Sequence, residues 1–112
     1  MSNNDKSKVA HVTGSSTGIG FETCLALARN GFNTCATMRD KSKSRILEKI
    51  ARSENLQIKV FEMDVDRDNS VCDTIEKIAT EYGKINVLVN NAGYGLCGAL
   101  ADFSMDEMVL LT

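Results

Sequence analysis

A stretch with three glycines, Thr13 to Gly20, is the part of the sequence whose residue types and spacing point most directly to chemistry. It reads Thr-Gly-Ser-Ser-Thr-Gly-Ile-Gly, and its glycines have separate tasks if the segment binds a pyrophosphate. Gly14 permits a tight turn, Gly18 lets the backbone approach a phosphate, and Gly20 lets a following helix pack closely against a sheet. The spacing therefore predicts a turn that binds phosphate groups.

The residues between the glycines would supply the donors. The first N–H groups of a helix are unpaired and carry partial positive charge, which favours a phosphate. Ile19 would lie in that first turn. Additional hydroxyl donors are expected from Ser15, Ser16 and Thr17.

Two other chemistries share parts of this pattern. Gly14 to Gly18 also matches Gly-x-Ser-x-Gly, the nucleophile turn of many hydrolases, which needs a downstream histidine to activate its serine. The chain has one histidine, His11, and it lies upstream, so we do not expect a hydrolase. A P-loop is excluded because no Lys-Ser/Thr pair follows the glycines.

The hydrophobic periodicity predicts the elements that position this turn. A buried strand, 8–13, comes before it, and a helix, 19–30, comes after it and ends at Gly31. Strands and helices then alternate along the chain, with strands at 33–37, 58–63 and 85–89 and helices at 44–55 and 68–82. The order βαβαβαβ predicts an α/β fold of the Rossmann-like, doubly wound type, with a parallel sheet in strand order 3-2-1-4.

Helical steps also predict which side chains pack inward. In the first helix Ile19 and Thr23 have this spacing. In the second, one apolar face contains Ile46, Leu47, Ile50 and Ala51. In the third, apolar residues recur every three or four positions, at Val71, Ile75, Ile78 and Tyr82. At the end of the chain, Ser104 to Glu107 forms a capping box that predicts another helix, whose apolar face begins at 108–112. On that expectation the outer edge of the fourth strand, 87–89, would be unpaired.

Composition limits the classes of function. With 112 residues, 43% of them hydrophobic and 25% charged, the chain fits one domain, which we place at 8–112 after a polar tail at 1–7. A net charge of −2 gives no general attraction to nucleic acid or anionic membranes. The absence of a long apolar run or a signal-like segment leads us to expect a cytoplasmic protein with no membrane contact.

Cysteine and histidine usage argues against a metal site. Cys24, Cys35, Cys72 and Cys97 lie far apart in the sequence, with no Cys-x-x-Cys pair. We expect reduced, mostly structural thiols. His11 lies within a strand pattern, and a packed or edge-strand role is expected for it instead of catalysis.

Three motifs together resemble the short-chain dehydrogenase/reductase family. They are the glycine motif at 13–20, Asp64-Val65 after the third predicted strand, and Asn90-Asn91-Ala92-Gly93 after the fourth. The resemblance covers the chain from Lys8 onward and implies the cofactor-binding half of such a protein. It implies that Asp64 and Val65 lie beside the adenine ring and that Asn91, Ala92 and Gly93 contact the cofactor.

The end of the second strand bears on the choice of cofactor. A carboxylate about 20 residues after the glycines binds the ribose 2′-hydroxyl of NAD, whereas an arginine accommodates the 2′-phosphate of NADP. Here Arg39 resembles the basic residue of NADP-preferring family members, although Asp40 follows it. NADP(H) is therefore favoured over NAD(H).

The family's proton-transfer pair, Tyr-x-x-x-Lys, does not occur in this sequence. Asn86 lies four residues after Tyr82, and Gly98 lies four residues after Tyr94, so we assign no catalytic residue. Because family members have about 200–250 residues, we expect a fragment of an oxidoreductase that moves a hydride between NADP(H) and a carbonyl or alcohol substrate. A stand-alone nucleotide-binding or regulatory module remains the alternative. The substrate stays open, and so does the oligomeric state, with a homo-oligomer possible.

Overall fold

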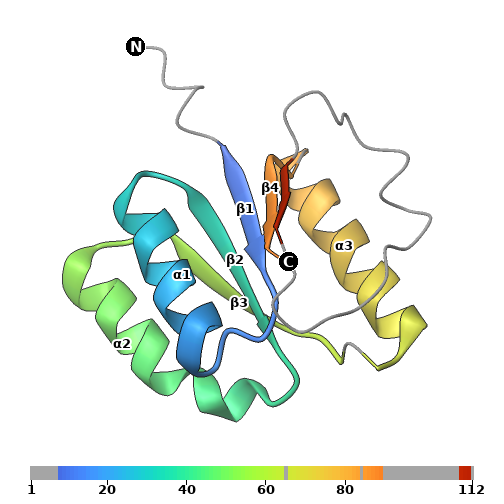
Figure 1. Cartoon of the computed structure of the whole chain (residues 1–112), viewed down its shortest axis with the longest axis horizontal. Helices are drawn as coiled ribbons and strands as arrows, with labels where there is room; N and C mark the ends of the chain where they lie inside the picture. Colours follow the sequence, from blue (N-terminus) through green and yellow to red (C-terminus); the bar gives the residue numbers. More distant parts are fainter. Residues whose placement is uncertain (1–7, 65, 84, 90–108, 112) are drawn as a thin grey trace.

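The computed structural model describes residues 8–64, 66–83, 85–89 and 109–111. They form a five-stranded parallel sheet in the order β3-β2-β1-β4-β5 (Figure 1). The strands are β1 (Val9–Val12), β2 (Asn33–Met38), β3 (Ile58–Glu62), β4 (Val87–Val89) and β5 (Val109–Leu111). The helices are α1 (Gly18–Arg29), α2 (Arg45–Glu54) and α3 (Asp68–Tyr82), with a short 3₁₀ helix, η2 (Lys41–Ser44), between β2 and α2.

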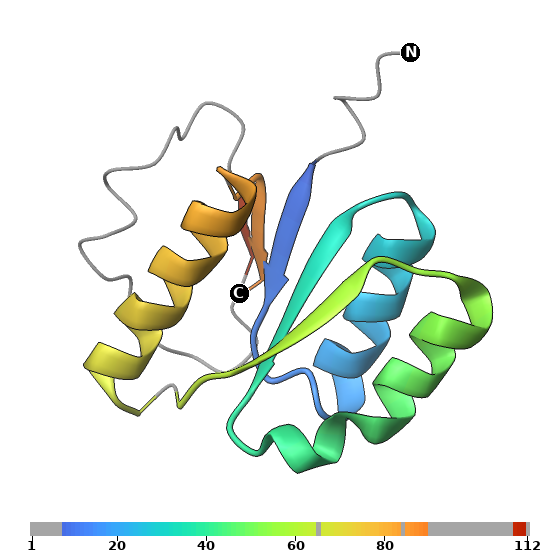
Figure 2. The ribbon, with the colours of Figure 1, turned by 180° about the vertical axis from the view of Figure 1, so that it is seen from behind.

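The helices cover both faces of the sheet. Figures 1 and 2 show α1 and α2 on one face and α3 on the other. Each face has its own apolar core, one including Val12, Cys24 and Leu47 beneath α1 and α2, the other including Val9 and Ile75 beneath α3. This arrangement confirms the predicted doubly wound sheet and the order 3-2-1-4 of its first four strands.

β1 is the central strand of the described sheet and is fully enclosed. It pairs with β2 on one side, where Val9 is level with Asn33, and with β4 on the other, where Val12 is level with Val89. All four residues of β1 are buried. A parallel strand buried on both faces has a mainly apolar sequence. The segment Val-Ala-His-Val is apolar except for His11, and the strand was therefore predicted to within a residue at each end.

Two helices turn their buried faces differently from the expectation. In α1 the predicted row began at Ile19, but Ile19 is 74% exposed and the buried residues are Gly20, Cys24, Leu25 and Ala28. In α2, Leu47 and Ala51 are buried as expected, whereas Ile46 is 66% exposed. Helical spacing of apolar residues predicts a helix, but it does not by itself determine which face of the helix packs against the sheet. In α1 the row that faces the sheet contains Gly20, Cys24 and Ala28.

The end of the chain also differs from the expectation. Residues 109–111, predicted to lie in a helix, form β5, which pairs in parallel with β4 and covers the edge at 87–89 that we expected to be unpaired. The edge of β4 offers unpaired N–H and C=O groups, and the apolar Val-Leu-Leu segment satisfies them as a strand. The predicted capping box at 104–107 lies outside the described residues.

Candidate functional site

The loop between β1 and α1 is anchored to both neighbouring strands. The backbone N–H of Thr13 donates to the carbonyl oxygen of Val89 at the end of β4, at 3.0 Å. The N–H of Ser15 donates to the carbonyl of Thr37 near the end of β2, at 3.1 Å. Between them Gly14 has φ +63°, a conformation that glycine adopts without strain. The loop is therefore fixed at the carboxyl edge of the sheet.

The side chain of Ser15 points inward. It is fully buried, and its hydroxyl donates to the carbonyl of Val12 at 2.7 Å and accepts a hydrogen bond from the Cys24 thiol at 3.3 Å. Burial raises the pKa of Cys24 to about 11, so this group is a neutral thiol donor. In this structure the Ser15 hydroxyl holds the loop to β1 and α1, and its predicted contact with phosphate stays a prediction.

The N-terminus of α1 is open toward solvent. Thr17 occupies the N-cap position, but within the described chain its side chain makes no capping hydrogen bond, and the first turn contains no acidic residue. Thr17, Gly18 and Ile19 are exposed, and Ser16 is half-buried. Gly18 has φ +63°, and a Cβ added there would meet no atom of the described residues within 4 Å. The unpaired N–H groups of the first turn thus face open space beside a glycine.

The two charged residues after β2 have different surroundings. The carboxylate of Asp40 accepts hydrogen bonds from the backbone N–H of Ser42 at 3.0 Å and from its hydroxyl at 2.6 Å, and so caps η2. These bonds lower the pKa of Asp40. Arg39 is exposed, and its guanidinium lies 3.8 Å from the carboxylate of Asp66.

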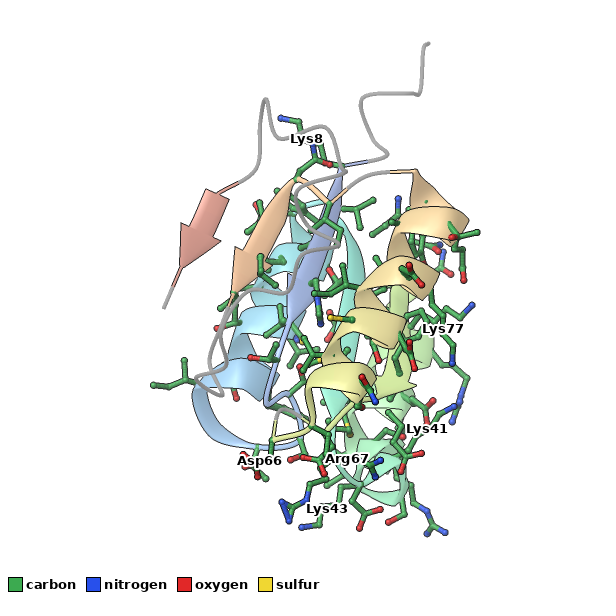
Figure 3. The ribbon with its side chains drawn as sticks, turned by 90° about the vertical axis from the view of Figure 1, so that its right-hand side faces the viewer. Lys8, Lys41, Lys43, Asp66, Arg67 and Lys77 are labelled. Atoms are coloured by element: carbon green, nitrogen blue, oxygen red, sulfur yellow. The ribbon has the colours of Figure 1, made fainter. Side chains whose placement is uncertain are left out.

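The turn after β3 faces the same edge. One carboxylate oxygen of Asp64 accepts the N–H of Asp66 at 3.0 Å, and the N–H of Asp64 donates to the hydroxyl of Ser70 at 2.9 Å. α3 then begins at Asp68, with Arg67 at the N-cap position. In Figure 3, Lys8 marks the end where β1 begins, and Asp66, Arg67 and Lys43 gather at the opposite end.

Several predicted site residues lie outside the described residues. They are Val65, Asn91, Ala92 and Gly93, and the roles implied for them stay predictions. The last described residue before this segment in the sequence is Val89, whose carbonyl accepts the N–H of Thr13. The glycine loop therefore touches the end of the strand that leads into the Asn-Asn-Ala-Gly segment.

His11 takes no part in this site. It is buried in β1, and its Nε2 lies 3.0 Å from the hydroxyl of Thr37. The Thr37 hydroxyl donates to the carbonyl of Val12 at 3.1 Å, so its oxygen accepts the Nε2 hydrogen of His11. Burial lowers the pKa of His11 to about 4, which makes it a neutral, packed side chain, as expected from the sequence.

Comparison with known proteins decides the family. A model described as short chain dehydrogenase matches residues 8–110. The chain belongs to the short-chain dehydrogenase family. Salutaridine reductase of Papaver somniferum is 37% identical over 103 residues, and retinol dehydrogenase 8 of Bos taurus is 38% identical over 108. These matches cover 90% and 93% of this chain but 31% and 34% of the relatives, so the chain spans about a third of their length.

Solved structures of short-chain dehydrogenase relatives share the fold. The F189W variant of actinorhodin polyketide ketoreductase, determined with NADPH, is 31% identical with a TM-score of 0.74, covering 93% of this chain and 40% of that one. A metagenomic short-chain oxidoreductase in complex with NADP is also 31% identical, with a TM-score of 0.73, covering 81% and 41%. Both structures contain a phosphorylated dinucleotide.

The described residues fit such a dinucleotide. The open N-terminus of α1 has the donor groups and partial positive charge that a pyrophosphate requires, and Gly18 leaves space for its approach. Arg39 offers a guanidinium suited to a further phosphate. Across the described residues there is no group of His, Cys, Asp and Glu that could hold a metal, and none of the helices found there could cross a membrane.

The sequence reasoning missed Asp66. Asp66 lies in the turn between β3, which ends at Glu62, and α3, whereas its ion-pair partner Arg39 follows another strand, β2. Only the parallel pairing of β2 and β3, with Met38 level with Glu62, brings the two turns together.

Proposed function

We propose that this chain binds NADP(H) along the carboxyl edge of β1, β2 and β3. The single observation that carries the proposal is the N-terminus of α1, which has no side-chain cap, no acidic residue in its first turn and a glycine beside open space. An uncapped helix N-terminus at the first βα turn of a doubly wound sheet is where the pyrophosphate of a dinucleotide binds.

The tasks of the residues follow from their places. The N–H groups of Gly18, Ile19 and Gly20 face the pyrophosphate, with the Ser16 and Thr17 hydroxyls beside them. Arg39 binds the 2′-phosphate, and the turn at Asp64 and Val65 lies beside the adenine. Asn91, Ala92 and Gly93 complete the proposed site.

The preference for NADP(H) over NAD(H) has three supports. The carboxylate of Asp40, which could otherwise favour a ribose 2′-hydroxyl, is engaged by Ser42. Arg39 is exposed and presents its guanidinium at the same edge as the glycine loop. Two relatives of known structure were determined with NADPH or NADP.

For the complete protein we propose an oxidoreductase acting on a small carbonyl or alcohol compound. The bound dinucleotide supplies hydride transfer, and the residues of this chain bind and orient it. The 112 residues contain no Tyr-x-x-x-Lys, so we assign the proton transfer to none of them. A cytoplasmic location and assembly into homo-oligomers belong to the same proposal.

Calorimetric titration with NADPH and NADH tests the binding proposal, with Gly18→Val as the decisive variant. The valine side chain would occupy the space that the pyrophosphate needs. Gly31→Val is the matched control, because Gly31 also has positive φ (+91°) and no atom of the described residues near an added Cβ, but follows the C-terminal end of α1. We expect both variants to lose stability and only Gly18→Val to lose NADPH binding. Equal affinity in the two variants would contradict the proposal.

A further inference from the structure

The ion pair between Arg39 and Asp66 joins two turns that face the proposed adenosine end of the site. Arg39 follows β2 and Asp66 follows β3, and Nη1 of the arginine lies 3.8 Å from a carboxylate oxygen of the aspartate. Both side chains are exposed, at 70% and 78%. A long, exposed pair of this kind contributes little to folding stability.

Asp66 is placed differently from the other two carboxylates of these turns. Asp40 is bonded to the N–H and hydroxyl of Ser42, and Asp64 accepts the N–H of Asp66. Both therefore hold their own turns in shape. Among the described residues, Asp66 is the acidic side chain that forms an ion pair with Arg39.

The turn that carries Asp66 is fixed in place. Besides the bond from the Asp66 N–H to Asp64, the N–H of Arg67 donates to the carbonyl of Asp64 at 3.0 Å, and the Ser70 hydroxyl accepts the N–H of Asp64. These bonds hold the backbone of Asp66, and from there its exposed carboxylate reaches to 3.8 Å from the Arg39 guanidinium.

We propose that Asp66 competes with the 2′-phosphate of the cofactor for Arg39, so that the turn after β3 limits the protein's preference for phosphorylated over unphosphorylated dinucleotides. The proposal rests on the proposed function, because it assumes that Arg39 binds that phosphate. Two anions that share one guanidinium lie closer together than the Debye length of about 10 Å at 0.1 M salt, so they repel each other. A ribose 2′-hydroxyl carries no charge and meets no such repulsion.

The test measures calorimetric affinities of the 112-residue chain for adenosine 2′,5′-bisphosphate and for ADP. Replacing Asp66 by Asn keeps the size of the side chain and removes its charge. We expect Asp66→Asn to bind the 2′,5′-bisphosphate about three- to tenfold more tightly, as removing one exposed like charge predicts. The affinity for ADP should not change, and Asp66→Glu, which keeps the charge, should behave as the wild type.

Two further comparisons separate this effect from general charge or structure. The matched control is Glu76→Gln, which removes one exposed negative charge about 12 Å along α3 from its first residue, at 1.5 Å per residue. It should leave the ratio of the two affinities unchanged. In an Arg39→Ala background the Asp66→Asn gain should disappear, and in the wild-type background it should shrink as salt is raised.

Each failure has a distinct reading. The competition is wrong if Asp66→Asn binds the 2′,5′-bisphosphate no more tightly than the wild type does. It is also wrong if the affinities for the bisphosphate and for ADP increase by the same factor. Neither result contradicts nucleotide binding. The competition is also wrong if the gain persists without Arg39. If the wild-type chain binds neither ligand, the proposed function fails and this inference fails with it.

Discussion

Nε2 of His11 donates its hydrogen to the Thr37 hydroxyl at 3.0 Å, and this bond links the central strand to its neighbour beneath the glycine loop. The Thr37 hydroxyl in turn donates to Val12, while the Thr37 carbonyl accepts the N–H of Ser15. One side chain and one backbone group of Thr37 thus connect the strand interior to the loop. A proton added to His11 would go to Nδ1, which is buried and has no hydrogen-bond partner among the described residues.

The stability of the chain should fall between pH 6.5 and 4 because of His11. Burial lowers its pKa from 6.5 to about 4, so below pH 6.5 the unfolded chain takes up a proton that the folded chain refuses. The contribution is fully present above pH 6.5 and is lost as the pH falls toward the folded value, on the order of 3 kcal/mol in total. Urea unfolding at pH 7, 6, 5 and 4 measures the slope.

His11→Gln provides the control for that slope. Glutamine retains an N–H donor for Thr37 but does not titrate. We expect this variant to be less stable at pH 7 and to lose less stability on acidification. A slope identical to that of the wild type would assign the acid sensitivity to other groups.

Two neighbouring residues of α2 test which face of that helix is buried. Leu47 is 1% exposed in the core beneath α1 and α2, and Ile46 is 66% exposed. Leu47→Ala should cost about 2–5 kcal/mol through lost burial and a cavity, whereas Ile46→Ala should change stability by less than about 0.5 kcal/mol. Denaturant titration of both variants measures this. Comparable losses would mean that the helix is rotated from the position described.

The elements from β1 to β4 could be predicted because their signals are local. A short run that is apolar except for His11 identified β1, and helical spacing of Val71, Ile75 and Ile78 identified α3 and its buried face. The strand at 109–111 could not be predicted in this way. Its conformation is decided by the free edge of β4, 22 residues earlier in the chain where Val87 meets Val109, and the local capping pattern indicated a helix instead.

The parts of the candidate site that follow from a local sequence motif could be predicted. The contacts that depend on the three-dimensional fold could not. The glycines predict the loop, but the residues next to Ser15 in the sequence do not indicate that its hydroxyl points inward and bonds to Val12 and Cys24. The sequence likewise left the role of Asp40 open. In the structure its carboxylate is bonded to the N–H and the hydroxyl of Ser42. Such partners depend on the fold that places them.

Arg39→Ala should weaken NADPH binding far more than NADH binding. Only NADPH carries the phosphate that the guanidinium would meet, and a charge-assisted contact of that kind corresponds to about ten- to a hundredfold in affinity. Calorimetry with both cofactors gives the two ratios. Arg52→Ala is the control, since Arg52 is an exposed arginine in the last turn of α2. An equal loss for both cofactors would show that Arg39 does not discriminate between them.

The 112-residue chain should bind NADPH yet show no turnover with any carbonyl or alcohol substrate. The proposed phosphate and adenine contacts lie at the ends of β1, β2 and β3, and none of them is an acid or base placed to protonate a substrate oxygen. The sequence holds no Tyr-x-x-x-Lys. Without a positioned proton donor the alkoxide that develops during hydride transfer is not neutralised, and general acid–base assistance of about 10²- to 10⁴-fold is lost.

The measurement is an NADPH-oxidation assay with a panel of ketones, aldehydes and quinones, on chain whose NADPH binding has first been shown by calorimetry. Binding without turnover is the expected result, because the sequence holds no Tyr-x-x-x-Lys pair to transfer the proton. Robust turnover by the purified wild-type chain would show that the proton donor lies within these 112 residues and that our placement of the chemistry is wrong.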